Sequence, residues 1–171
     1  MVDWQAIVAD HGPTVWRTVY RIVADHADAL DCYQETFLSA YRSPPRQSVR
    51  DWAAYLTTLA ARRAIDRLRE RDRLGRRVTS LDHAPPPLAR EPDPADQAVA
   101  AELTDQVRRA LPRLADRQAE VFWLSCVEGL SHDQIAAQLQ STPGAIRVLL
   151  HRARTSLTVA LNSIEMERTK T

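Results

Sequence analysis

Arginines are crowded into one short stretch of the chain, where their density suggests phosphate binding. Residues 62–77, RRAIDRLRERDRLGRR, hold eight arginines against three acids, Asp66, Glu70 and Asp72. The formal net charge of the whole chain is only +1, so this basic character is local. A cluster of guanidinium groups is the surface that a nucleic-acid backbone selects. We therefore expect a nucleic-acid contact in this stretch.

A second candidate is the stretch SHDQIAAQLQSTPGAIRVLLHRAR at residues 131–154, which has the pattern of two short helices separated by a turn. Ser131 and Gln134 are spaced as a capping box, which marks the start of the first helix. Thr142 supplies an N-cap and Pro143 a first-position proline for the second helix. The pattern predicts a helix-turn-helix, whose second helix lies in the major groove of DNA.

This second helix is predicted to have one buried and one exposed face. At about 100° per residue, Ile146 and Leu150 share the side that packs on the domain. Val148 lies opposite and either contacts thymine methyl groups or faces solvent or a partner, whereas Leu149 is expected at the edge of the core. Arginines here suit phosphate contacts. The candidate DNA contacts are Thr142, Gly144, Ala145, Arg147, Val148, His151, Arg152 and Arg154.

An acidic and amidic face is predicted upstream, in the segment DCYQETF. Asp31, Gln34 and Glu35 are spaced by three and four residues, so they share one face of a helix expected over about residues 28–42. Taken alone, such a face is either a solvated surface or a protein contact.

No catalytic motif is recognisable. The five histidines are scattered, there is no glycine-rich phosphate loop, and no nucleophile sits in a known motif. Cys32 and Cys126 each fall in an apolar helical pattern, so we expect buried structural thiols rather than metal ligands. We expect a non-enzymatic protein with no cofactor and no metal.

The fold class is predicted to be all-α, because apolar residues recur at three and four positions and glycine occurs only four times in 171 residues. The first helix is expected to follow Gly12 and Pro13, with the proline at its first position. The third is expected to begin near Ser48, which is spaced with Asp51 as a capping box.

Two small helical domains follow from this pattern. We expect them at residues 1–75 and 98–163, joined by a proline-rich acidic linker at 76–97 and followed by a disordered tail at 164–171. No run approaches the roughly 18 apolar residues of a membrane-spanning helix, and the N-terminus has no secretory signal pattern. A cytoplasmic protein without membrane insertion is expected.

Three stretches together resemble the sigma-70 family of bacterial transcription initiation factors, in its short extracytoplasmic-function (ECF) form. They are ADALDCYQETFLSAYR, YLTTLAARRAIDRLRER and, after the linker, the segment ALPRLADRQAEVFWLSCVEGLSHDQIAAQLQSTPGAIRVLLHRARTSL. The resemblance covers the chain from about Trp4 to Leu161, and the motifs occur in the family's order and spacing.

The resemblance implies a dissociable subunit of RNA polymerase that gives the core enzyme its promoter. Asp31, Gln34 and Glu35 would dock on the core polymerase. The helix-turn-helix would read the minus-thirty-five element of promoter DNA, and a cognate anti-sigma factor is a common family partner. The minus-ten element would be read and opened by Arg62, Arg63, Asp66, Arg67 and Arg69.

The chain departs from the family pattern at three places. Arg62 stands where the family commonly has asparagine, near the pocket for a flipped minus-ten base, and Gln140 stands where the turn usually has glycine. Arg147, Val148 and Leu149 replace a polar and basic triplet of the recognition helix. These changes bear on base preference and on the backbone of the turn.

Two other interpretations remain open from the sequence. One is a helix-turn-helix regulator with an N-terminal sensory or dimerisation domain, which would leave the basic third helix and the DCYQETF face without a role. The other is a degenerate sigma-like interaction module without promoter activity, which the substitutions at Arg62, Val148 and Leu149 allow.

Overall fold

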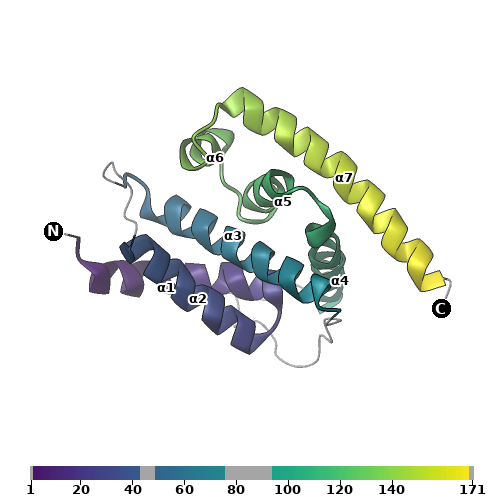
Figure 1. Ribbon diagram of the computed structural model, residues 1–171, viewed down its shortest axis with the longest axis horizontal. Coiled ribbons are helices and arrows are strands. Elements are labelled where there is room, and N and C mark those ends of the chain that lie inside the picture. The colour runs from purple at the N-terminus through teal and green to yellow at the C-terminus, as the bar shows by residue number, and fades with distance from the viewer. Residues whose placement is uncertain (1, 43–48, 76–93, 170–171) are drawn as a thin grey trace.

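A computed structural model of the chain describes residues 2–42, 49–75 and 94–169 and shows only helices among them (Figure 1). This confirms the all-α prediction. The α-helices are α1 (Trp4–Val23), α2 (His26–Arg42), α3 (Trp52–Arg73), α4 (Pro94–Ala110), α5 (Asp116–Phe122), α6 (His132–Gln138) and α7 (Pro143–Thr169). A 3-10 turn, η1 (Leu111–Arg113), and a π-helical turn, η2 (Trp123–Val127), lie on either side of α5.

Helix α1 begins well before the predicted start at Pro13. Asp3 is its N-cap and accepts a hydrogen bond from the Ala6 amide at 3.1 Å, and Pro13 lies inside the helix. Gly12 serves close packing instead of a turn, because a Cβ there would lie 2.8 Å from the Tyr33 hydroxyl of α2. The loss of one helical hydrogen bond at Pro13 is offset by burial of apolar residues on both sides of it, from Ile7 to Val19.

The start of α3 also differs from the prediction. Asp51 is the N-cap and accepts a hydrogen bond from the Ala54 amide at 2.9 Å, so α3 starts at Trp52. Ser48, the predicted start, lies outside the described residues. One aspartate at the cap suffices because it satisfies a free amide of the first turn.

The predicted linker and tail each overlap a helix. Most of the predicted linker, residues 76–93, lies outside the described residues, but 94–97 already belong to α4. The disordered tail expected at 164–171 is helical as far as Thr169. Ile164 packs against the apolar cluster and Glu167 pairs with Arg113 at 2.9 Å, and these contacts hold the last turns of α7 in place.

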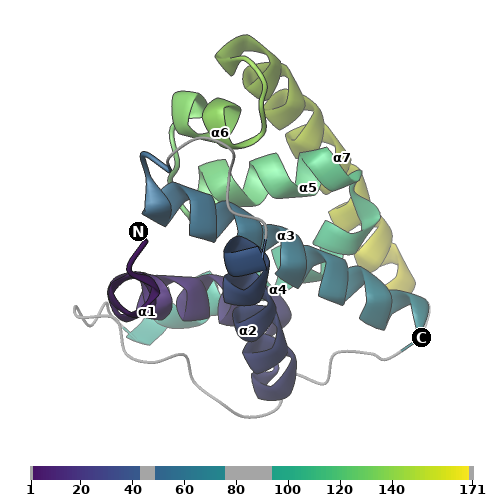
Figure 2. The ribbon, with the colours of Figure 1, turned by 60° about the vertical axis from the view of Figure 1, so that its left-hand side comes forward.

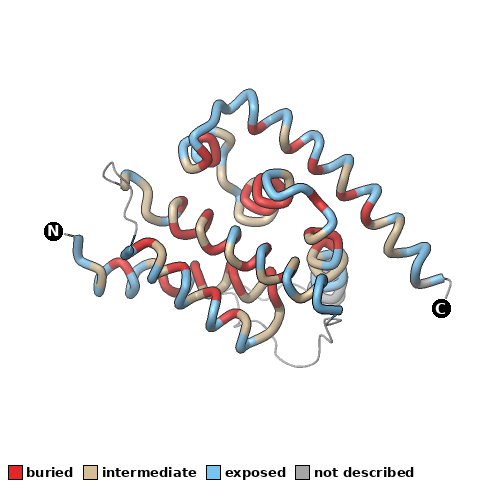
Figure 3. Tube along the Cα trace, in the orientation of Figure 1, coloured by how far each residue is buried: buried red, intermediate tan, exposed pale blue. Residues whose placement is uncertain are grey.

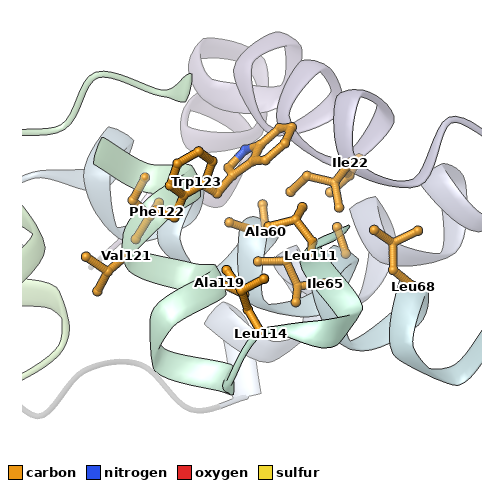
Figure 4. Close-up of a cluster of buried hydrophobic side chains, with 14 of the residues drawn as sticks. Ile22, Ala60, Ile65, Leu68, Leu111, Leu114, Ala119, Val121, Phe122 and Trp123 are labelled. Atoms are coloured by element: carbon orange, nitrogen blue, oxygen red, sulfur yellow. The ribbon is translucent and has the colours of Figure 1, made fainter. Parts of the chain in front are cut away.

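Helix α3 lies in the middle of the molecule. Figures 1 and 2 show it between the α1 and α2 side and the α5, α6 and α7 side. Buried residues line the surfaces that face one another (Figure 3) and form one continuous apolar cluster across both halves. In Figure 4, Leu111 and Ala119 lie against Ile65 of α3, and Trp123, which is fully buried, completes the cluster.

No helix within the described ranges is both long enough and apolar enough to cross a bilayer.

Candidate nucleic-acid and polymerase interface

The helix-turn-helix is built as the sequence predicts. The Ser131 amide donates to Gln134 Oε1 at 3.0 Å and the Gln134 amide donates to Ser131 Oγ at 3.2 Å, which completes the capping box. Thr142 Oγ1 accepts from the Ala145 amide at 3.2 Å and caps α7. Gln140 in the turn has φ 50°, a left-handed conformation that favours glycine.

Helix α7 separates its residues onto the two predicted faces. Ile146, Leu150 and Ala153 are buried, and Leu149 is partly buried against the apolar cluster. Val148 is 51% exposed on the outer face, which confirms its predicted exposure. All eight candidate DNA contacts on this motif are exposed, namely Thr142, Gly144, Ala145, Arg147, Val148, His151, Arg152 and Arg154.

The two cysteines differ from each other, and the prediction for one of them is wrong. Cys32 is buried, and burial raises the pKa of its thiol to about 12. Cys126 is exposed, with its sulfur 3.9 Å from an Arg154 guanidinium nitrogen. The π-helical turn explains the difference, because an inserted residue rotates Cys126 away from the buried side that α5 establishes.

The predicted polymerase-binding face of α2 is open. Asp31, Gln34 and Glu35 are exposed and lie on one side of the helix. Apolar side chains beside them are exposed too, at Leu30 and Leu38. Sequence reasoning missed these two, although their spacing of four from Gln34 was a readable signal. The result is an exposed acidic surface with apolar neighbours, and exposed apolar residues that lie together are a feature of surfaces that bind a partner.

The four arginines of α3 predicted to bind minus-ten DNA are engaged with other groups of the protein. On the α2 side, Arg67 contacts Asp28 at 2.7 Å and Glu70 at 2.9 Å, and these two carboxylates raise its pKa. Arg67 also approaches Asp31 at 3.8 Å. Arg63 donates to Ser39 Oγ at 2.9 Å. These two arginines therefore connect the basic stretch to the α2 face.

The other predicted minus-ten residues face the opposite half of the molecule. Arg62 donates to Glu120 from Nη2 at 2.8 Å and from Nε at 3.1 Å, both to Oε1. Arg69 contacts Asp116 at 2.9 Å and the neighbouring Asp66 at 3.4 Å. The predicted phosphate-binding surface is thus covered in part by α5.

Glu120 is the main site residue that sequence reasoning missed. Its side chain is only 6% exposed, and burial raises its pKa while Arg62 opposes the shift. The one local signal is its position between two buried apolar residues, Ala119 and Val121. Its partner stands 58 residues away, so the pair could not be read from spacing.

Near the start of α3, aromatic rings cluster without being free for stacking on bases. Trp52 lies 5.5 Å from Trp4 and 5.9 Å from Tyr55, each in an edge-to-face arrangement. All three are partly buried against the apolar cluster. In this arrangement they act in packing.

A helical protein with a capped helix-turn-helix and an exposed acidic face has the features of DNA-binding transcription proteins. Comparison with known families makes this specific. The family described as Sigma-70 region 2 matches residues 7–74, and Sigma-70, region 4 matches residues 104–157. Because region 2 occupies the N-terminal half, a regulator with a sensory domain there is not favoured.

Relatives over nearly the whole chain agree. RNA polymerase sigma factor CarQ of Myxococcus xanthus is 34% identical, covering 96% of this chain and 92% of that protein. ECF RNA polymerase sigma factor SigL of Mycobacterium tuberculosis is 30% identical with the same coverage. SigE of Mycolicibacterium smegmatis is 29% identical over 92% of this chain, which spans 61% of that protein's length. The chain belongs to the sigma-70 family, in its ECF group.

Solved structures share the fold. Sigma factor RpoE of Bartonella quintana, in complex with the anti-sigma factor NepR, has a TM-score of 0.56 at 20% identity, covering 94% of this chain and 97% of that one. CnrH, in complex with the cytosolic domain of CnrY, has a TM-score of 0.56 at 22% identity, covering 94% and 88%.

Proposed function

We propose that the protein is a cytoplasmic, non-enzymatic sigma factor that binds core RNA polymerase and promoter DNA and directs the start of transcription. It needs no cofactor for this role. The α2 face, with Asp31, Gln34 and Glu35, docks on the core enzyme. Helix α7 reads the minus-thirty-five element, and the basic face of α3 reads and opens the minus-ten element. An anti-sigma factor is a proposed further partner.

One observation carries this proposal. The residues proposed to bind polymerase on α2 and those proposed to bind DNA on α7 are exposed, and the two helices lie on opposite sides of α3 and α5 (Figures 1 and 2). One chain can therefore hold a protein partner and duplex DNA at once. Simultaneous binding raises the effective concentration of promoter contacts, so the protein should bind promoters strongly only with core polymerase.

The test mixes the protein with bacterial core polymerase and a randomised promoter library and sequences the transcribed templates. The expected result is a set of transcribed templates enriched for two sequence elements at a fixed separation. Absence of core binding would favour a free regulator. Core binding without transcripts would favour the degenerate module.

A matched pair of variants tests the docking face. Glu35→Lys reverses a charge on the exposed α2 surface and should weaken core binding at least about tenfold, because like charges brought together at an interface are costly. Glu102→Lys makes the same charge change on an exposed residue of α4 and should leave core binding unchanged. Equal binding by both variants would remove α2 from the interface.

A further inference from the structure

Helix α5 lies on the α3 surface that the proposed function assigns to minus-ten DNA. The α3–α5 seam is formed by Arg62, Ile65, Asp66 and Arg69 of α3 with Asp116, Arg117 and Glu120 of α5. Arg69 contributes twice, to Asp116 at 2.9 Å and to the Leu114 carbonyl at 3.1 Å. Two of the arginines proposed to bind the promoter, Arg62 and Arg69, therefore donate hydrogen bonds to residues in the other half of the chain.

Little space is left at the seam. A cavity of about 230 Å³ lies between the two helices, which is smaller than the roughly 300–1,000 Å³ typical of small-molecule sites. Ile65, which lines this cavity, lies against Leu111 in the buried apolar cluster (Figure 4). This leaves little room for a nucleotide strand between α3 and α5 while they remain packed.

Arg62 can pair with Glu120 or with a DNA phosphate, and the buried charge of Glu120 makes these two pairings exclusive while α5 stays in place. Glu120 is 6% exposed, whereas Arg62 is 46% exposed and can be approached by another anion. Arg117 lies 4.0 Å from Glu120 and gives only partial compensation. If Arg62 turned to a DNA phosphate with α5 still in place, Glu120 would remain as a buried carboxylate without its main partner, which is strongly unfavourable. Burial already raises the pKa of Glu120 despite Arg62.

We propose that this arrangement is a closed state of the sigma factor, in which Glu120 competes with minus-ten DNA for Arg62 and α5 must leave α3 before that DNA can bind. The inference rests on the proposed function, because it takes α3 as the minus-ten surface. The DNA face of α7 stays exposed in the closed state. Closure therefore blocks one of the two promoter contacts and leaves the other open.

The first test measures opening directly with spin labels and pulsed electron resonance. Labels go on cysteines placed at the exposed residues Arg73 of α3 and Ala137 of α6, in a Cys126→Ser background. Cys32 stays unlabelled because it is buried, with a pKa of about 12. The full chain without polymerase should show one main distance, that of the closed state.

Two substitutions then separate charge from packing. Arg62→Met leaves Glu120 without its main partner, and the ratio of closed to open molecules should fall at least about tenfold. Adding Glu120→Gln removes the stranded charge, so the double variant should return to the closed distance. An unchanged distance in Arg62→Met, or a double variant that stays open, would overturn the proposal.

The second test measures competition with DNA. Glu120→Lys places a cation against Arg62 and Arg117 while leaving α3 intact, and should open the molecule. Its affinity for a random-sequence, fluorescein-labelled single-stranded DNA pool about 20 nucleotides long should rise about tenfold above that of Glu102→Lys, which carries the same added charge. An open molecule with no gain over this control would show that α5 does not compete with DNA.

The proposed function and the closed state can be rejected separately. Loss of core binding or of promoter-specific transcripts with the wild-type protein would reject the proposed function and leave the measured distances standing. A Glu120→Lys variant that is unfolded by circular dichroism would be replaced by the Arg62→Met and double-variant comparison, which decides closure by itself.

Discussion

Arg62 of α3 donates both of its hydrogen bonds to one oxygen of Glu120, a residue 58 positions later in the chain. The two partners differ in exposure, at 46% and 6%. The pair therefore joins a half-exposed cation to a buried carboxylate, whose desolvation is only partly compensated. Because the buried carboxylate is only partly compensated, the stability that this pair contributes should depend on pH.

The pair predicts a specific pH dependence of stability. Burial raises the pKa of Glu120 above its ordinary value, so the folded protein binds this proton more tightly than the unfolded chain. Stability from this group is fully present below the unfolded pKa and is lost as the pH rises through the raised folded pKa. Glu120→Gln has no such loss, so its free energy of unfolding should increase relative to wild type between about pH 4 and pH 7.

Urea unfolding at several pH values measures this difference. Glu167→Gln is the control, because the pKa of that exposed carboxyl is lowered by Arg113 and the sign of its effect is opposite. A gap between Glu120→Gln and wild type that stays constant with pH would contradict the prediction.

The turn of the helix-turn-helix gives a second prediction. Gln140 holds φ 50°, and a residue with a Cβ pays about 1 kcal/mol for that conformation. Gln140→Gly relieves this strain but makes the unfolded chain more flexible, so the free energy of unfolding should rise by roughly 0.5 kcal/mol. Gly129, at φ 73°, is the reverse control: Gly129→Ala should destabilise. Both are measured by urea unfolding, and a loss of stability in Gln140→Gly would show that the side chain matters more than the backbone.

Features determined by neighbouring residues could be predicted from the sequence. The capping box of Ser131 and Gln134, the cap at Thr142 and the faces of α7 depend on residues a few positions apart, and the structure confirms them. Pro13 was wrongly placed at a helix start, because α1 is capped by Asp3 and continues through the proline with buried residues on both sides, from Ile7 to Val19. That burial depends on packing against other helices and cannot be read from neighbouring residues.

The candidate site, too, was predicted only where it depends on neighbouring residues. The composition of residues 62–77 indicated an anion-binding surface, but not that Glu120 and Asp116 would lie on it. Such pairing depends on how the two halves of the chain pack together. The periodicity of the apolar residues is compatible with many different packings and does not select one of them. Cys126 was wrongly predicted to be buried, because a π-helical turn changes the phase of the helix by one residue.

A buried hydroxyl gives a third prediction. Thr18 Oγ1 is fully buried and makes no hydrogen bond with any described residue. Replacing it by a methyl group in Thr18→Val should raise the free energy of unfolding by about 1 kcal/mol, because an unpaired buried polar group is costly. Thr36 is the matched control: its hydroxyl donates to the Cys32 carbonyl at 2.7 Å. Thr36→Val should be neutral or destabilising in the same thermal or urea unfolding assay, and equal gains in both would contradict the role of the missing bond.

The outer face of α7 gives the last prediction, which depends on the proposed function. Val148 is exposed opposite the buried side of the helix, where a methyl-bearing side chain can contact a thymine methyl group. Val148→Ser should reduce the preference for one thymine of the minus-thirty-five element by about 1 kcal/mol, roughly fivefold, and leave the salt dependence of binding unchanged. Arg152→Gln, on the same exposed face, should instead weaken binding to all sequences and reduce the salt slope by about one ion. Holoenzyme binding to a set of single-base promoter variants at several salt concentrations separates the two patterns. If Val148→Ser weakened binding equally on every sequence, the residue would be a positional contact, and base reading at this element would have to come from other residues of the same face.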